Sequence, residues 1–208
     1  MSDPLTAEAE LAASLADVRR AFRLAVAYQQ RMNALFYKVH LALGDANMEL
    51  DWWAPNRQNP PMKWDKPQFR PTTWAWDLFP GHSLSAEWSD TSAAPARRVW
   101  LALDTDTALQ AAKARGGEPD PTLFRDDGRT ELWAEVCTWA TPATPWSTIW
   151  PALQPRWREG HDKEWQWAAA GTTGTYTAFC VPVEKLTTPE AADTLLVHRL
   201  RDAVRRSP

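Results

Sequence analysis

The sequence predicts an α+β fold, in which a long N-terminal α-helix and a C-terminal α-helix pack against a mainly antiparallel sheet of about four to five strands. Residues 5–43 contain neither glycine nor proline and show a helical apolar repeat, whereas residues 97–183 contain several short strand-like segments. Strands that follow one another without regular helical crossovers favour an antiparallel sheet over a doubly wound parallel one.

The first predicted element is a helix that begins near Pro4 and ends near Gly44. Asp3 suits the N-cap, Pro4 the first helical position, and Gly44 the left-handed position beyond the last turn. Alternating steps of four and three residues define what we call the heptad seam, in which nine of ten positions are apolar: Leu11, Leu15, Val18, Phe22, Ala25, Gln29, Met32, Phe36, Val39 and Leu43. This spacing is typical of a coiled coil.

The heptad seam has two interpretations. Either the rest of the domain covers it, or its N-terminal half contacts a second copy or another protein, through Leu11, Leu15, Val18, Phe22 and Gln29. The helix would be about 60 Å long, whereas a compact domain of this size is roughly 45 Å across. We therefore predict a docking or oligomerisation helix over residues 1–44, continuous with a Trp-rich α+β domain over residues 45–208, as a single folded unit.

The chain has more tryptophan than glycine, with 14 and 8 residues respectively. Tryptophan is enriched where one end of a side chain is buried and the other is wet, so some of the rings are expected to line a binding surface. Prolines exclude a helix over most of residues 45–96, and the many aromatic residues argue against disorder. We interpret this stretch as an ordered loop with one short strand, Thr73–Phe79. Its candidate binding residues are Trp52, Trp53, Trp64, Phe69, Arg70, Trp74 and Trp76.

Further strands are predicted from alternation of apolar side chains. They cover residues 97–104 and 132–139, and a hairpin is predicted from Glu164–Ala170 and Thr175–Val183 around a Gly171–Gly174 turn. Even spacing along a strand places side chains on one face, so the pairs Trp133/Trp139 and Trp165/Trp167, and Trp74/Trp76 in the earlier strand, should each share a face. That face is either covered by the long helix or open to a ligand.

Two helices are predicted in the second half of the chain. A short one follows the first of these strands over residues 105–115. The last begins at Pro189, with Thr188 as its cap. Its apolar stripe consists of Ala192, Leu195, Leu196, Leu200 and Ala203.

No strong catalytic or cofactor motif is present in the sequence. The glycine-rich phosphate-binding patterns are absent, and the four histidines and two cysteines do not have metal-ligand spacing, so neither a metal nor a cofactor is predicted. The weak candidates for a metal-dependent hydrolase are Asp104, Asp106 and Glu135, although Asp106 also suits the cap of a following helix. Cys137 and Cys180 are expected to be buried free thiols, with a disulfide as the alternative.

The net charge of −3 gives the whole molecule no bias toward nucleic acid or anionic membranes. Because the sequence shows no signal peptide and no membrane-spanning run, we expect a soluble, cytoplasmic protein without membrane contact. The preferred function is a non-enzymatic protein-interaction module, of an accessory, immunity or antitoxin-like kind, that binds a protein partner or forms a homodimer. The alternative is a small-ligand or single-stranded nucleic-acid binder that uses the aromatic and basic residues of 52–76, and a metal-dependent hydrolase comes third.

Overall fold

The computed structural model describes residues 4–55, 83–109, 124, 128–157 and 162–206. They form two compact units, Met1–Val39 and His40–Pro208. The first unit is helical, since α1 runs over Pro4–Gly44, and the last turn of this helix belongs to the second unit. The long helix predicted from the heptad repeat is therefore confirmed.

The end of α1 differs from the prediction. Gly44 is still helical, and the left-handed conformation falls on Asn47, with φ of 60°. The amide of Asp45 donates to the Leu41 carbonyl (3.1 Å), and the amide of Met48 donates to the Leu43 carbonyl (3.0 Å). These bonds satisfy the last carbonyls of the helix, so no left-handed glycine is needed directly after it. Asp3 lies outside the described residues.

The second unit is built on a six-stranded sheet in the order β1-β2-β3-β4-β6-β5, with every neighbouring pair antiparallel. The α+β fold is as predicted, with more strands than the four to five expected. The strands are β1 (Glu49–Pro55), β2 (Ser83–Asp90), β3 (Ala96–Asp104), β4 (Glu131–Trp139), β5 (Lys163–Ala169) and β6 (Thr172–Pro182).

The interpretation of residues 45–96 as an ordered loop is wrong at both of its ends. Strands β1 and β2 occupy residues 49–55 and 83–90, and they pair with each other. In β2, the buried Leu84, Ala86 and Trp88 alternate with serines and Glu87, which is the pattern of a strand with two different faces. Prolines interrupt the stretch but do not fall inside β2. The predicted strand Thr73–Phe79 and most of the predicted helix over 105–115 lie outside the described residues.

The hairpin of β5 and β6 is confirmed, but its turn is shorter than predicted. Ala170 and Gly171 alone form the loop, and both have positive φ angles, 53° and 74°. Two positive φ values in a two-residue loop match the twist of the flanking strands. Gly174 lies within β6 instead, where it faces the ring of Trp167.

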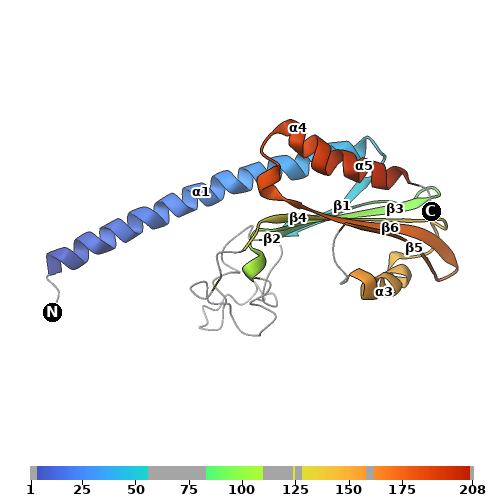
Figure 1. The fold of residues 1–208 in the computed structure, drawn as a ribbon, viewed down its shortest axis with the longest axis horizontal. Helices are drawn as coiled ribbons and strands as arrows, with labels where there is room; N and C mark the ends of the chain where they lie inside the picture. Colours follow the sequence, from blue (N-terminus) through green and yellow to red (C-terminus); the bar gives the residue numbers. More distant parts are fainter. Residues whose placement is uncertain (1–3, 56–82, 110–123, 125–127, 158–161, 207–208) are drawn as a thin grey trace. The chain divides into compact units, whose positions relative to one another are not determined.

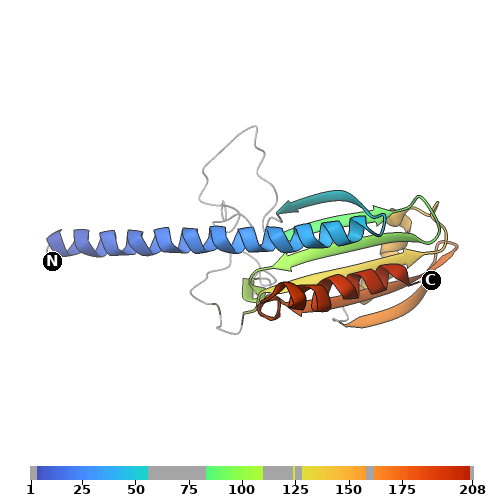
Figure 2. The ribbon, with the colours of Figure 1, turned by 90° about the horizontal axis from the view of Figure 1, so that it is seen from above.

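Helices lie on opposite sides of the sheet (Figure 1). One side carries α4 (Pro189–Ala192), the π-helical segment η4 (Asp193–Val197) and α5 (His198–Arg205), which run lengthwise along the strands (Figure 2). The other carries α3 (Trp146–Trp157), and a short 3₁₀ turn, η3 (Val183–Lys185), follows β6. The Thr188 cap is confirmed, because its hydroxyl accepts from the Ala191 amide (3.2 Å).

The strand register divides the side chains of the sheet between two faces, because directly paired residues of antiparallel strands share a face. On the side of α4 and α5, apolar rows cross β2, β3, β4 and β6, and their buried members are Leu84, Ala86, Trp88, Val99, Leu101, Leu103, Leu132, Ala134, Val136, Phe179 and Val181. The stripe of the last helix is buried at Ala192, Leu196, Leu200 and Ala203. This face is the main core of the second unit.

Candidate functional site

The opposite face of the sheet, which we call the tryptophan face, collects tryptophan rings from four strands, β1, β3, β4 and β5. By register these are Trp52, Trp100, Trp133, Trp139, Trp165 and Trp167. The prediction that Trp133 and Trp139 share a face, and that Trp165 and Trp167 do so as well, is confirmed. A second hydrophobic cluster forms here around Trp139, Trp167 and Tyr176, with Ile149 and Leu153 of α3 packed into it.

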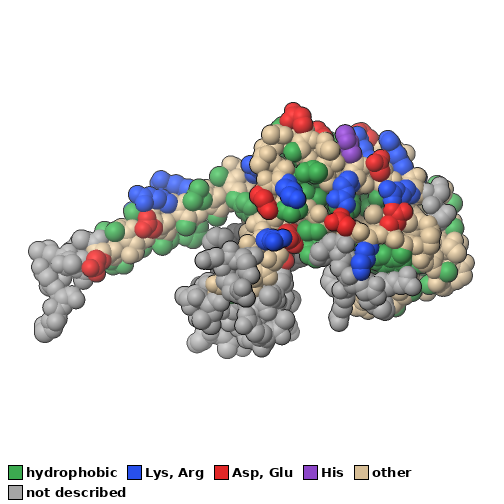
Figure 3. Space-filling model, viewed as in Figure 1, with side chains coloured by type: hydrophobic (Ala, Val, Ile, Leu, Met, Phe, Trp, Pro, Cys, Tyr) green, Lys and Arg blue, Asp and Glu red, His purple; other side chains and the backbone are tan. Residues whose placement is uncertain are grey.

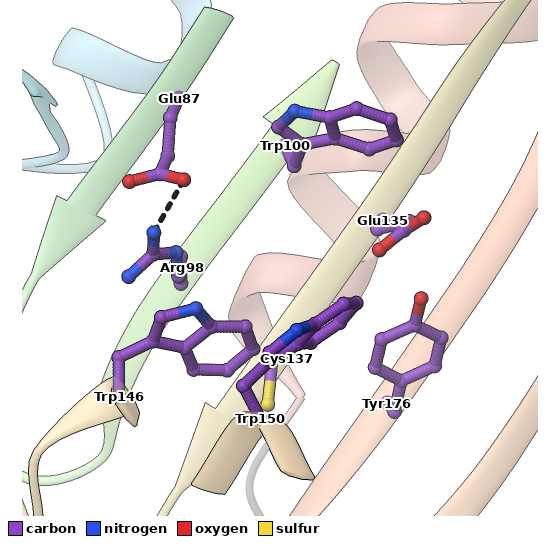
Figure 4. Close-up of a pocket in the computed structure, with 8 residues that line it drawn as sticks. All are labelled: Glu87, Arg98, Trp100, Glu135, Cys137, Trp146, Trp150 and Tyr176. Carbon is purple, nitrogen blue, oxygen red and sulfur yellow. Dashed lines mark ion pairs between the residues drawn. The ribbon is translucent and has the colours of Figure 1, made fainter. Parts of the chain in front are cut away.

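A cavity of about 210 Å³ opens on the tryptophan face beside α3. The strands supply its floor, and Figure 4 shows Trp146 and Trp150 closing one side of it from α3. These two residues lie four positions apart and therefore share a face of the helix, with ring centroids 5.7 Å apart. The lining consists of Glu87, Arg98, Trp100, Glu135, Cys137, Trp146, Trp150 and Tyr176.

Charged side chains are held inside this aromatic lining. Arg98 of β3 forms an ion pair with Glu87 of β2, and its guanidinium carbon lies 4.5 Å from the ring centroid of Trp146. Glu87 and Glu135 are both buried, at 8% exposure each. The Tyr176 hydroxyl points toward Glu135 (Figure 4), and burial together with the Glu135 carboxylate raises the pKa of this hydroxyl well above its usual value.

The thiols on this face are not activated. Both cysteines are free, as predicted, with Cys137 buried and Cys180 half-buried. Burial raises the pKa of the Cys137 thiol far above its ordinary value, although Trp167 and Arg98 oppose the shift. Burial, and to a lesser degree Glu131, raises the pKa of Cys180 to about 12. Because the thiolate is the nucleophile, neither cysteine is suited to covalent chemistry near neutral pH.

A separate candidate surface lies in the first unit, along the heptad seam of α1. Leu11, Leu15, Val18 and Phe22 are 60%, 48%, 49% and 57% exposed. Gln29, the polar member of the seam, is half-buried. In Figure 3, Lys and Arg side chains gather on one side of this helix, and hydrophobic side chains run along its length. The unit thus carries a row of exposed apolar side chains at coiled-coil spacing.

The predicted aromatic binding residues are only partly within the described chain. Trp52 and Trp53 lie on the edge strand β1, with 41% and 61% exposure. Trp52 pairs with Glu87, so the register brings it next to the lining of the cavity. Trp64, Phe69, Arg70, Trp74 and Trp76 lie outside the described residues.

The structure does not bring the three candidate carboxylates together. Asp104, at the end of β3, pairs with Glu131 of β4. The residue of β3 that pairs with Glu135 is Trp100, which precedes Asp104 by four residues. Four residues correspond to about 13 Å along a strand, so Asp104 and Glu135 lie far apart. Asp106 accepts a hydrogen bond from the Ala108 amide (2.9 Å), as a capping residue does. Within the described part of the chain, no group of three or more His, Cys, Asp or Glu side chains could hold a metal ion. Glu135 instead lines the aromatic cavity.

Sequence reasoning missed most of the cavity. Arg98 and Trp100 alternate with the core residues Val99 and Leu101, so their position on the opposite face could have been read from β3 alone. The four-residue spacing of Trp146 and Trp150 was also available, but prolines in this segment obscured the helix. What the sequence could not provide was the strand order that places these side chains beside Tyr176.

The fold and the site together define an α+β protein with a ligand-sized aromatic cavity on one sheet face and a long helix with a heptad seam. A family model described as PM0109 matches residues 8–206, so the chain belongs to the PM0109 family. No curated protein and no solved structure matches the chain. Among the helices that the structure describes, none has the length and apolarity needed to cross a membrane.

Proposed function

We propose that this protein is an interaction module in which the exposed N-terminal part of the heptad seam of α1 pairs with the same part of a second copy. The seam residues from Met32 onward are buried within the chain. The observation that carries this proposal is the exposure of Leu11, Leu15, Val18 and Phe22, each at least 48%, at successive seam positions. A helix in a protein owes most of its stability to the packing of its apolar face rather than to helix propensity. The first unit has no second element of its own among the described residues to provide this packing.

A second copy is the occupant that the polar residue of the seam favours. Counting Leu11 as a d position places Leu15, Phe22 and Gln29 at a positions. In a parallel, in-register pair, Gln29 faces Gln29 of the partner, so polar side chains meet each other instead of apolar ones. The ion pair of Asp17 and Arg20 (2.8 Å) lies off the seam and stays solvated, with both side chains more than 70% exposed. A different protein with a matching heptad, as an accessory or antitoxin-like role would require, is the alternative occupant.

Sedimentation equilibrium of the full chain tests this proposal. The weight-average mass is expected to rise with protein concentration from that of one chain to twice that value, because coiled-coil pairing of one helix from each copy closes after two chains. A mass that stays at one chain throughout the micromolar range would contradict self-pairing and favour a different protein as the partner.

A further inference from the structure

The cavity on the tryptophan face has the size of a small-molecule site. Its volume is about 210 Å³, and an apolar cavity of about 150 Å³ is large enough to hold benzene. Apolar surface dominates its lining, to which Trp100, Trp146, Trp150 and Tyr176 contribute four aromatic side chains. A molecule with one ring and a short substituent, of about seven to ten non-hydrogen atoms, therefore fits the space.

The charged side chains of the lining are already engaged within the protein. Arg98 forms an ion pair with Glu87. Glu135 also has an interaction partner within the chain. A charged ligand of either sign would lose its hydration on entry without gaining a counter-charge that is free to pair with it. The lining therefore favours an uncharged ligand.

The thiol and the phenol of the lining carry no charge near neutral pH. Burial raises the pKa of the Cys137 thiol and of the Tyr176 hydroxyl, so both groups stay protonated. Water beside a mainly apolar lining finds few hydrogen-bond partners and is poorly ordered. An apolar ligand gains affinity by displacing such water.

The rings that border the cavity favour a ligand that is itself aromatic. The guanidinium of Arg98 occupies one face of the Trp146 ring, 4.5 Å from its centroid. Trp100 of β3 and Trp150 of α3 border the cavity from different elements, and Figure 4 shows them on different sides of it. Aromatic rings in contact attract each other beyond what the burial of their surface contributes, so an aromatic ligand gains more here than a saturated one.

We propose that this cavity binds a small uncharged aromatic molecule, whose ring contacts Trp100 and Trp150. The cavity lies wholly within the second unit, so this binding is independent of the pairing of the heptad seam.

Calorimetric titration of the full chain with matched probes tests the proposal. Benzyl alcohol is the uncharged aromatic probe, and cyclohexylmethanol is its saturated counterpart. Benzylamine, protonated at neutral pH, and benzoate supply a cation and an anion of similar size. Benzyl alcohol is expected to bind at least about tenfold more tightly than either ion, because neither ion finds a free counter-charge. It should bind at least about fivefold more tightly than cyclohexylmethanol, because only its ring gains the attraction of two tryptophan rings.

Three variants locate the binding. Trp100→Leu and Trp150→Leu are each expected to weaken the binding of benzyl alcohol at least about fivefold, because each removes a ring contact together with apolar surface. Trp53→Leu removes a tryptophan that is 61% exposed and outside the lining, so it should leave binding unchanged. Circular dichroism verifies the fold of each variant, and the variant that keeps its fold decides the result if the other does not.

Four results would overturn the proposal. They are equal or tighter binding of cyclohexylmethanol, tighter binding of benzylamine or benzoate, unchanged affinity in a folded Trp100→Leu or Trp150→Leu variant, and no saturable binding of benzyl alcohol in the millimolar range.

Discussion

A chain carrying Leu15→Asp is expected to remain monomeric at concentrations where the unsubstituted chain pairs. Leu15 lies near the middle of the exposed part of the heptad seam and is 48% exposed in the single chain. Burying a leucine contributes about 1.5–3 kcal/mol, and a symmetric pair loses two such side chains and gains two carboxylates in its interface. The association constant should therefore fall at least about 100-fold, which sedimentation equilibrium measures directly.

The matched control for this variant is Ala13→Asp. Two residues along a helix correspond to a rotation of about 200°, so position 13 lies on the side of α1 away from Leu15. This control introduces the same residue, with the same helix propensity and charge, outside the seam. Equal loss of pairing in both variants would mean that negative charge on the helix, and not the seam, controls association.

Replacement of Gly174 by alanine is expected to destabilise the second unit by about 3 kcal/mol, the upper end of the range for overpacking a core. A Cβ at this position would overlap the Thr138 carbonyl oxygen and the six-membered ring of Trp167. The carbonyl belongs to the neighbouring strand and cannot move without disturbing the pairing of β4 with β6. Urea unfolding followed by tryptophan fluorescence measures the change in the free energy of unfolding.

Gly44→Ala provides the control for the glycine experiment. Nothing lies within 4 Å of a Cβ added at Gly44, and this glycine ends a helix without a positive φ. Alanine is the better helix former, so the free energy of unfolding should be unchanged or raised by up to about 1 kcal/mol. If the Gly174→Ala variant proves as stable as the Gly44→Ala variant, that result would contradict the close packing of Gly174 against the Trp167 ring.

The features that local patterns determine could be predicted from the sequence. The heptad spacing of α1, the alternation in β3 and β4, and the cap at Thr188 each depend on residues a few positions apart. Strand β2 has the same kind of alternation, but serines fill many of its positions and prolines surround it, and its burial depends on pairing with β1 and β3. The apolar content of Ser83–Asp90 alone is therefore too low to predict strand β2.

The cavity could not be predicted because it depends on pairing between distant segments. Trp100 and Glu135 are 35 positions apart and meet as direct partners of β3 and β4. Tyr176 reaches the same place through β6, which pairs with β4 although β5 precedes it in the chain. The sequence offers Glu135 as a candidate carboxylate for metal chemistry, whereas the fold places it in the lining of a cavity with four aromatic side chains.

Disulfide cross-linking at the heptad seam tests the central proposal most directly. Val18→Cys places a thiol on the exposed seam, and burial keeps the pKa of both native thiols so high that the new one reacts first. The comparison is with Ala13→Cys, whose thiol lies on the side of α1 away from the seam. Under mild oxidation, Val18→Cys is expected to form a covalent dimer readily and Ala13→Cys is not. Equal yields from the two variants, or no dimer from Val18→Cys, would contradict pairing of the seam with a second copy.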